Sequence, residues 1–303
     1  MLKIILLFTV SVAASGLTSY FYKRLTNDST HRSYSVLSSA AWMFPVSLIF
    51  FTVSSISGDF NPTFNLTAAA LLTGSAAAAA TFMLLESLRK GSYTTAIIII
   101  NMNFYIPILF SRLFLGEKAT PLQLAGILLA TVVIVLINIG AKNADRPKDS
   151  LSGIIAACFA CLANGTVNFG IKLQQFMTPG EGENTFFCLT YFFSAAISVI
   201  LFFILRDKKA KPAEQAIRFS RLKKYFIPAL GLGICMTLCY YPQSILAAIP
   251  EINAAAQFTV TVTGSLILSL VIGWIHFKEK ITYAGIISLM LGLLAVVFQW
   301  LSY

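Results

Sequence analysis

Charge is scarce in this chain, and histidine is almost absent. Of its 303 residues only 11% are Asp, Glu, Lys or Arg, 57% are hydrophobic, and there are two histidines. Soluble globular domains carry roughly 25% charged residues. The composition therefore excludes a water-soluble helical protein and indicates a chain that lies largely within a lipid bilayer.

Patterns typical of enzymes are also missing. An enzyme needs a nucleophile, an acid–base pair or a metal site, but no Asp or Glu lies near the middle of an apolar run, and neither GxSxG nor HExxH occurs. The five cysteines all fall inside apolar runs: Cys158, Cys161, Cys188, Cys235 and Cys239. We interpret them as small apolar helix residues, although Cys158 and Cys161 have the CxxC spacing. We therefore expect neither enzyme activity nor a cofactor or metal.

Long apolar runs, by contrast, recur along the whole chain. A helix needs about 20 mostly apolar residues to cross a bilayer. Ten runs reach this length: about 3–22, 35–56, 65–88, 93–114, 119–141, 151–173, 184–205, 225–247, 254–275 and 281–301. The first is too long for a signal peptide, and its stronger charge, Lys23-Arg24, lies on the wrong flank. The predicted fold is an all-α integral membrane protein with ten transmembrane helices.

Lys and Arg are distributed unevenly between the loops on the two sides of these helices. Numbering the helices one to ten, 18 of the 22 Lys and Arg follow an odd-numbered helix. Basic loops are retained in the cytoplasm, so both termini are predicted to be extracytoplasmic. The net charge of +10 then reflects orientation, not a nucleic-acid partner. In the long loop after helix seven, Glu214–Lys224 is either an amphipathic helix on anionic lipid or a solvated loop.

One short phrase occurs twice in the chain. Residues 114–118 read FLGEK and are followed by ATPLQLAGILLATVVIVL, whereas residues 276–280 read HFKEK and are followed by ITYAGIISLMLGLLAVVF. The chain thus divides into a first five-helix repeat, 1–141, an inter-repeat loop, 142–150, and a second five-helix repeat, 151–303. Because five is odd, the second repeat enters the membrane from the opposite side, which predicts an inverted repeat.

These two motifs, together with the ten-helix pattern, resemble the drug/metabolite transporter superfamily, and within it the bacterial EamA-domain permeases. The likeness covers essentially the whole chain. The second copy differs from the first, because Lys278 replaces the glycine and Gly285 follows Glu279 three residues sooner than Gly126 follows Glu117. The motifs identify the fold much better than the substrate, and we interpret the Glu-Lys turn as architectural.

The resemblance implies a carrier with a central cavity that helices 1–4 and 6–9 surround, while helices 5 and 10 pack at the periphery, sometimes at a dimer contact. We expect a secondary transporter in the cytoplasmic (inner) membrane that moves a small polar metabolite or drug-like solute, such as an amino acid, by alternating access. The alternative is a component that flips lipids or lipid-linked sugars, as small relatives do. The expected partners are a small-molecule substrate and membrane lipid, with no nucleic acid, and the chain is a monomer or homodimer.

Helix six offers the clearest candidate site for the substrate. Asn164, Asn168 and Lys172 follow at steps of four, which places them along one helix face. Polar side chains in a spanning helix normally face a cavity or another helix. The set is therefore either a polar wall of the cavity or a source of interhelical hydrogen bonds, with Lys172 reaching toward water.

Other candidate residues lie on helices four, eight and nine. Pro107 frees the carbonyl of Asn103 from the helix ladder, which favours a cavity or a protein contact there. Tyr241 precedes Pro242 and suits a cavity or ordinary packing equally well. The remaining candidate substrate-binding residues are Asn101 and Tyr105 on helix four, and Gln257 and Thr261 on helix nine.

Overall fold

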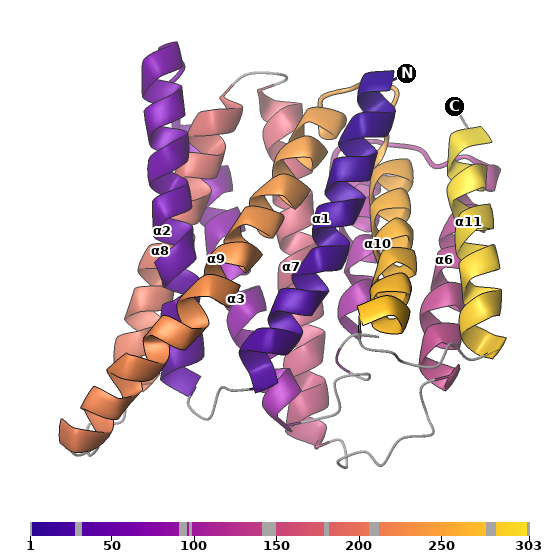
Figure 1. The fold of residues 1–303 in the computed structure, drawn as a ribbon. Helices are drawn as coiled ribbons and strands as arrows, with labels where there is room; N and C mark the ends of the chain where they lie inside the picture. Colours follow the sequence, from indigo (N-terminus) through magenta and orange to yellow (C-terminus); the bar gives the residue numbers. More distant parts are fainter. Residues whose placement is uncertain are drawn as a thin grey trace.

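The computed structural model describes residues 2–27, 32–90, 96, 99–140, 150–178, 182–205, 212–276 and 283–301. Its regular elements in these ranges are all helical (Figure 1). They are α1 (Leu2–Asn27), α2 (Arg32–Ser57), α3 (Phe64–Lys90), η1 (Met102–Phe104), α5 (Tyr105–Phe114), α6 (Pro121–Gly140), α7 (Leu151–Met177), α8 (Glu183–Leu205), α9 (Pro212–Ala247), α10 (Ala254–His276) and α11 (Tyr283–Leu301). The prediction of an all-α chain is confirmed over the described residues.

Six of these helices are long and apolar enough to cross a membrane: Leu2–Tyr22, Ala40–Ser57, Phe64–Leu88, Leu151–Met177, Glu183–Leu205 and Ile227–Ala247. Four shorter apolar helices stand where the other predicted spans lie: Ile99–Phe114, Pro121–Leu136, Ala254–Leu268 and Ile286–Leu301. Large apolar side chains are exposed on outer surfaces, among them Leu128 and Ile204. Such surfaces are stable in lipid but not in water, so the chain is a multi-pass membrane protein.

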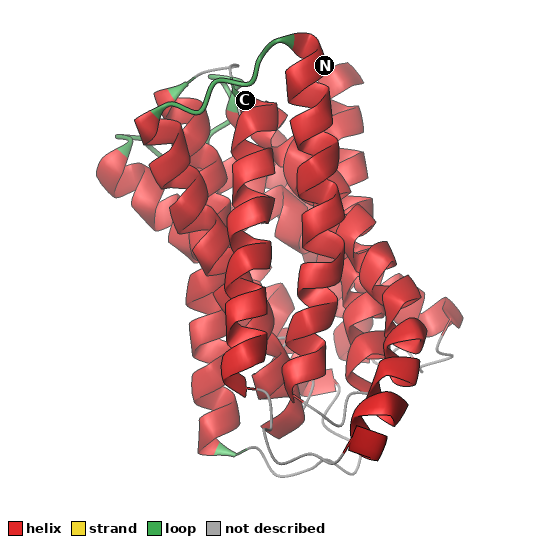
Figure 2. Cartoon of the chain, turned by 90° about the vertical axis from the view of Figure 1, so that its left-hand side faces the viewer, coloured by secondary structure: helices red, strands yellow, loops and turns green. Residues whose placement is uncertain are grey.

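The helices of the first half pack mainly against helices of the second half. Among the described elements, α1 contacts α9 and α10, α2 contacts α8 and α9, α3 contacts α7 and α8, and α5 contacts α7. At one side of the bundle α6 packs on α11 and α10 (Figure 1). Figure 2 shows both termini at the same end of the bundle. We call this the terminal end; it holds the loops between α5 and α6 and between α9 and α10.

The helix α9 is longer than the part of it that can cross a membrane. It has 36 residues, of which Ile227–Ala247 are the apolar span. The first residues extend beyond the bundle (Figure 1). Glu214–Lys224 lies within α9 and has a helical backbone, so the solvated loop considered above is wrong, while the contact with anionic lipid stays a prediction.

Two glycines show how closely the halves pack. A Cβ at Gly165 would lie 2.5 Å from the Cβ of Ile106 and 2.9 Å from the carbonyl oxygen of Asn103. A Cβ at Gly74 would lie 2.5 Å from the carbonyl oxygen of Thr190. Glycine is thus the residue that lets α7 meet η1 and α5, and α3 meet α8.

Candidate functional site

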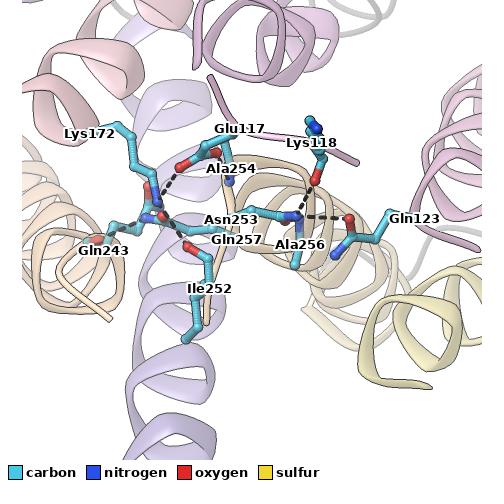
Figure 3. Close-up of polar contacts among 10 residues, drawn as sticks. All are labelled: Glu117, Lys118, Gln123, Lys172, Gln243, Ile252, Asn253, Ala254, Ala256 and Gln257. Atoms are coloured by element: carbon cyan, nitrogen blue, oxygen red, sulfur yellow. Dashed lines mark hydrogen bonds and ion pairs between the residues drawn. The ribbon is translucent and has the colours of Figure 1, made fainter. Parts of the chain in front are cut away.

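A buried lysine lies at the terminal end, between the two halves of the chain. Lys172, near the end of α7, is only 5% exposed. Its Nζ donates to the carbonyl oxygen of Ile252 at 2.8 Å and forms an ion pair with Oε1 of Glu117 at 3.0 Å (Figure 3). The sequence allowed Lys172 to reach toward water, but the described structure buries it against another protein segment.

Glu117 reaches Lys172 from the turn that follows α5. Gly116, with φ of +70°, gives this turn a backbone conformation that residues with a Cβ rarely adopt. The other carboxylate oxygen of Glu117, Oε2, accepts a hydrogen bond from the backbone N–H of Ala254 at 2.7 Å. Because Ala254 begins α10, its N–H lies at the positive end of the helix dipole, which stabilises a carboxylate.

The two loops at the terminal end are joined by further polar contacts. Asn253 caps α10, because its Oδ1 accepts from the N–H of Ala256 at 3.0 Å. Its Nδ2 donates to Oε1 of Gln123 at 2.8 Å and to the carbonyl oxygen of Lys118 at 3.2 Å (Figure 3). These contacts and the ion pair join the two halves of the chain at the terminal end.

Two buried glutamines lie on helices adjoining this network. Nε2 of Gln257, on α10, donates to the carbonyl oxygen of Gln243, on α9, at 2.7 Å. Nε2 of Gln243 donates to Oγ of Ser11, on α1, at 3.2 Å. The Oε1 atoms of both glutamines are buried, and neither has a hydrogen-bond partner among the residues that the structure describes. A buried acceptor with no donor is unfavourable, so both atoms would gain from a donor.

The predicted polar face of α7 makes contacts with both halves. Nδ2 of Asn168 donates to Oδ1 of Asn103 at 3.2 Å, and both side chains are buried. One turn away, Oη of Tyr240 donates to Oδ1 of Asn164 at 3.1 Å. Asn103 lies in the 3-10 turn η1, so the helix is irregular before Pro107, as the sequence indicated.

The other candidate residues make contacts of their own, outside the Asn103–Asn168 and Asn164–Tyr240 pairs. Oη of Tyr105 hydrogen-bonds with Oγ1 of Thr131 on α6. Oγ1 of Thr261 donates to the carbonyl oxygen of Gln257 in its own helix. The ring of Tyr241 packs with those of Phe50 and Phe187, each at a centroid distance of 5.7 Å. Asn101 is half-buried at the start of η1 and makes no side-chain capping bond.

In a comparison with known protein families, residues 2–139 match the EamA-like transporter family. These residues belong to that family. The predicted resemblance to the drug/metabolite transporters of the EamA type is therefore confirmed over these residues, and the match points to a membrane transporter of small solutes. No curated protein matches the chain at a significant level.

The chain also shares its fold with a protein of known structure over nearly its full length. That crystal structure, described only as "Crystal structure of protein", superposes with a TM-score of 0.74 and 15% sequence identity, covering 99% of this chain and 96% of the other. At this identity the similarity shows the fold alone. It extends across both halves, beyond the residues that the family match covers.

Sequence reasoning did not single out Glu117 or Gln243. Glu117 was interpreted as part of an architectural turn, and it does accept a bond at the start of α10, but it also pairs with Lys172. The sequence held a usable indication, since a lysine inside an apolar helix needs an anion and Glu117 lies at the same predicted membrane side. The corresponding turn of the second copy, 277–280, lies outside the described residues. Within the described part, no three His, Cys, Asp or Glu side chains gather as a metal site would require.

Proposed function

We propose that this EamA-like chain is a secondary transporter of a small polar solute, such as an amino acid or a related metabolite, across the cytoplasmic membrane. The observation that carries the proposal is the Glu117–Lys172 ion pair, which joins the two halves at one end of the bundle. A charged pair in the interior of a membrane protein typically marks a substrate or ion pathway. The Asn103–Asn168 bond, one helical turn from Lys172, also joins the two halves.

Transport would proceed by alternating access between two inverted five-helix repeats. Beyond the two Glu-Lys turns, residues 14–23 read ASGLTSYFYK and residues 163–172 read ANGTVNFGIK, with Ala, Gly and Lys at matching places. The packing supports the same correspondence. In the proposed repeats α3 corresponds to α9 and α5 to α10; α1 contacts α9 and α10 of the second repeat, and α7 likewise contacts α3 and α5 of the first. These two observations support the proposal that α1 and α7 are corresponding first helices of the two repeats.

In this mechanism the described conformation is closed at the terminal end. Opening that end would separate Glu117 from Lys172 and Asn253 from Gln123. The solute would then reach the polar side chains between the halves, including Asn103, Asn168, Lys172 and Gln257. The other candidate residues, Asn101, Tyr105, Asn164, Thr261 and Tyr241, would shape the walls of the same pathway.

The test is solute counterflow into liposomes that contain the purified protein. Vesicles preloaded with unlabelled amino acids should accumulate radiolabelled amino acid from outside, and empty liposomes should not. Fluorescent phospholipid reporters in the same vesicles measure flipping, which is the competing activity. Lipid scrambling without accumulation of any solute would reject the solute carrier in favour of a flippase.

A further inference from the structure

We propose that Lys172 binds the transported solute directly and that this solute carries a carboxylate, which replaces Glu117 as the partner of Lys172 when the terminal end opens. This inference rests on the transporter function proposed above and names its substrate class.

A buried ammonium group needs an anion in every state in which it stays buried. The described contacts of the Lys172 Nζ use two of its three hydrogens, one toward Glu117 and one toward the neutral carbonyl of Ile252. Glu117 is the only anion among these two partners. When Glu117 moves away and the terminal end opens, Lys172 keeps a neutral acceptor and becomes accessible from solution. It then needs a new anion before it can be buried again.

Glu117 depends less on this ion pair than Lys172 does, because its carboxylate has a second favourable contact. Its Oε2 accepts the N–H of Ala254 at the positive end of α10, and its side chain is 23% exposed, against 7% for that of Lys172. Glu117 can therefore release Lys172 and remain compensated by the helix end and by solvent. The lysine is the partner that requires a replacement, and an entering carboxylate supplies one. Glu117 thereby acts as a built-in competitor that closes the terminal end when no solute is bound.

The neighbouring glutamines indicate a second feature of the solute. Oε1 of Gln243 and Oε1 of Gln257 are buried acceptors to which no described residue donates. Gln257 lies one turn after Asn253 in α10, since its N–H donates to the carbonyl oxygen of Asn253 at 3.0 Å, and its side chain reaches the backbone of Gln243. Both glutamines are thereby linked to the start of α10, where Glu117 and Ile252 meet Lys172. An ammonium or hydroxyl group of the solute would satisfy these oxygens. The solute class is therefore a small carboxylate that also carries a hydrogen-bond donor, as amino acids and hydroxy acids do.

The first experiment compares carboxylates with their carboxamides in the counterflow assay. The probes are the protein L-amino acids, lactate and malate, each paired with its carboxamide. The wild-type protein should exchange at least one carboxylate and fail to exchange the matching carboxamide. Lys172→Gln should raise the half-saturating concentration of that carboxylate at least tenfold. Lys3→Gln, which removes an exposed lysine beside the N-terminus at the same end, should leave it unchanged.

The second experiment separates binding from a purely structural role. The double variant Lys172→Glu with Glu117→Lys keeps the ion pair but moves the positive charge to the first half of the chain. Its melting temperature should recover toward the wild-type value relative to each single variant, while exchange of the carboxylate stays lost. This variant also preserves the test if Lys172→Gln alone fails to fold.

Three results would overturn the proposal while leaving the transporter function intact: wild-type affinity for the carboxylate in Lys172→Gln, restored exchange in the charge-swapped variant, or wild-type exchange confined to the carboxamides. Failure of the wild-type protein to exchange any probe, charged or neutral, while it scrambles lipid would instead reject the proposed function, and the substrate class with it.

Discussion

At the scale of single residues, the Asn103–Asn168 bond carries two roles that can be separated. Nδ2 of Asn168 satisfies Oδ1 of Asn103, and both side chains are buried between the halves. As an interhelical contact the bond contributes about 0.6–2 kcal/mol. As part of the solute pathway the same amides would also bind the solute, which a stability measurement alone does not detect.

We predict that Asn168→Leu weakens both stability and apparent solute affinity. The substitution leaves Oδ1 of Asn103 without this donor, and a solute group that loses its partner costs about 1–3 kcal/mol, or roughly tenfold to a hundredfold in affinity. The measurement is half-saturation in counterflow beside the melting temperature of the purified protein. Thr166→Val is the matched control, since Oγ1 of Thr166 bonds only within α7, to the carbonyl of Leu162. A lower melting temperature with wild-type affinity would show that the amide pair only joins helices.

At the scale of elements, the close approach of α7 to the first half depends on Gly165, a residue without a side chain. Gly165 lies in the middle of α7 and packs directly on Ile106 and on the carbonyl of Asn103. That carbonyl belongs to η1, the 3-10 turn next to Pro107. The irregular segment of the first half and the glycine of the second half therefore fit each other, and this fit brings Asn103 within reach of Asn168.

We predict that Gly165→Ala destabilises the protein although alanine favours helices more than glycine does. The new methyl group would lie 2.5 Å from the Cβ of Ile106 and 2.9 Å from a backbone oxygen, so α7 and α5 must move apart. Overpacking of this kind typically costs about 1–3 kcal/mol. Thermal unfolding of the purified variant measures the loss. Thr166→Leu, which adds bulk one position along the same helix at a half-buried site, should unfold near the wild-type temperature. Equal melting temperatures for Gly165→Ala and the wild type would mean that the two helices are not held in close contact.

At the scale of the whole molecule, the arrangement of the helices places both termini at one end of the bundle. The end of α3 and the start of α7 meet at the opposite end, where Oγ of Ser150 donates to the carbonyl oxygen of Lys90 at 2.7 Å. An ion pair between Lys90 and Glu86, 2.7 Å apart, lies at the same place. From the distribution of Lys and Arg we predict that this opposite end faces the cytoplasm.

We predict that a fluorescent protein that matures only in the cytoplasm stays dark when fused to either terminus of the chain. The same reporter inserted in the inter-repeat loop, between residues 145 and 146, should fluoresce, because that loop is predicted to face the cytoplasm. Immunoblots of all three fusions provide the control for expression. Bright fusions at both termini with a dark loop insertion would reverse the orientation. One bright and one dark terminus would contradict the even number of membrane crossings.

Much of this protein follows from its sequence alone, because hydropathy and repetition are local properties of the chain. The apolar runs marked the helical segments, since backbone groups in lipid must be satisfied within each segment. The Glu-Lys turns pointed to the transporter family, which residues 2–139 confirm. Pro107 indicated an irregular helix, and the 3-10 turn η1 stands beside it.

Only the tertiary structure decided which polar residues meet. The sequence placed Asn164, Asn168 and Lys172 on one face, but their partners Tyr240, Asn103 and Glu117 lie far away along the chain. Such pairs depend on how helices from the two halves pack, and neither hydropathy nor helical periodicity encodes that packing. For this reason the sequence showed Glu117 only as part of an architectural turn, and the packing of the helices was needed to identify it as the counterion of Lys172.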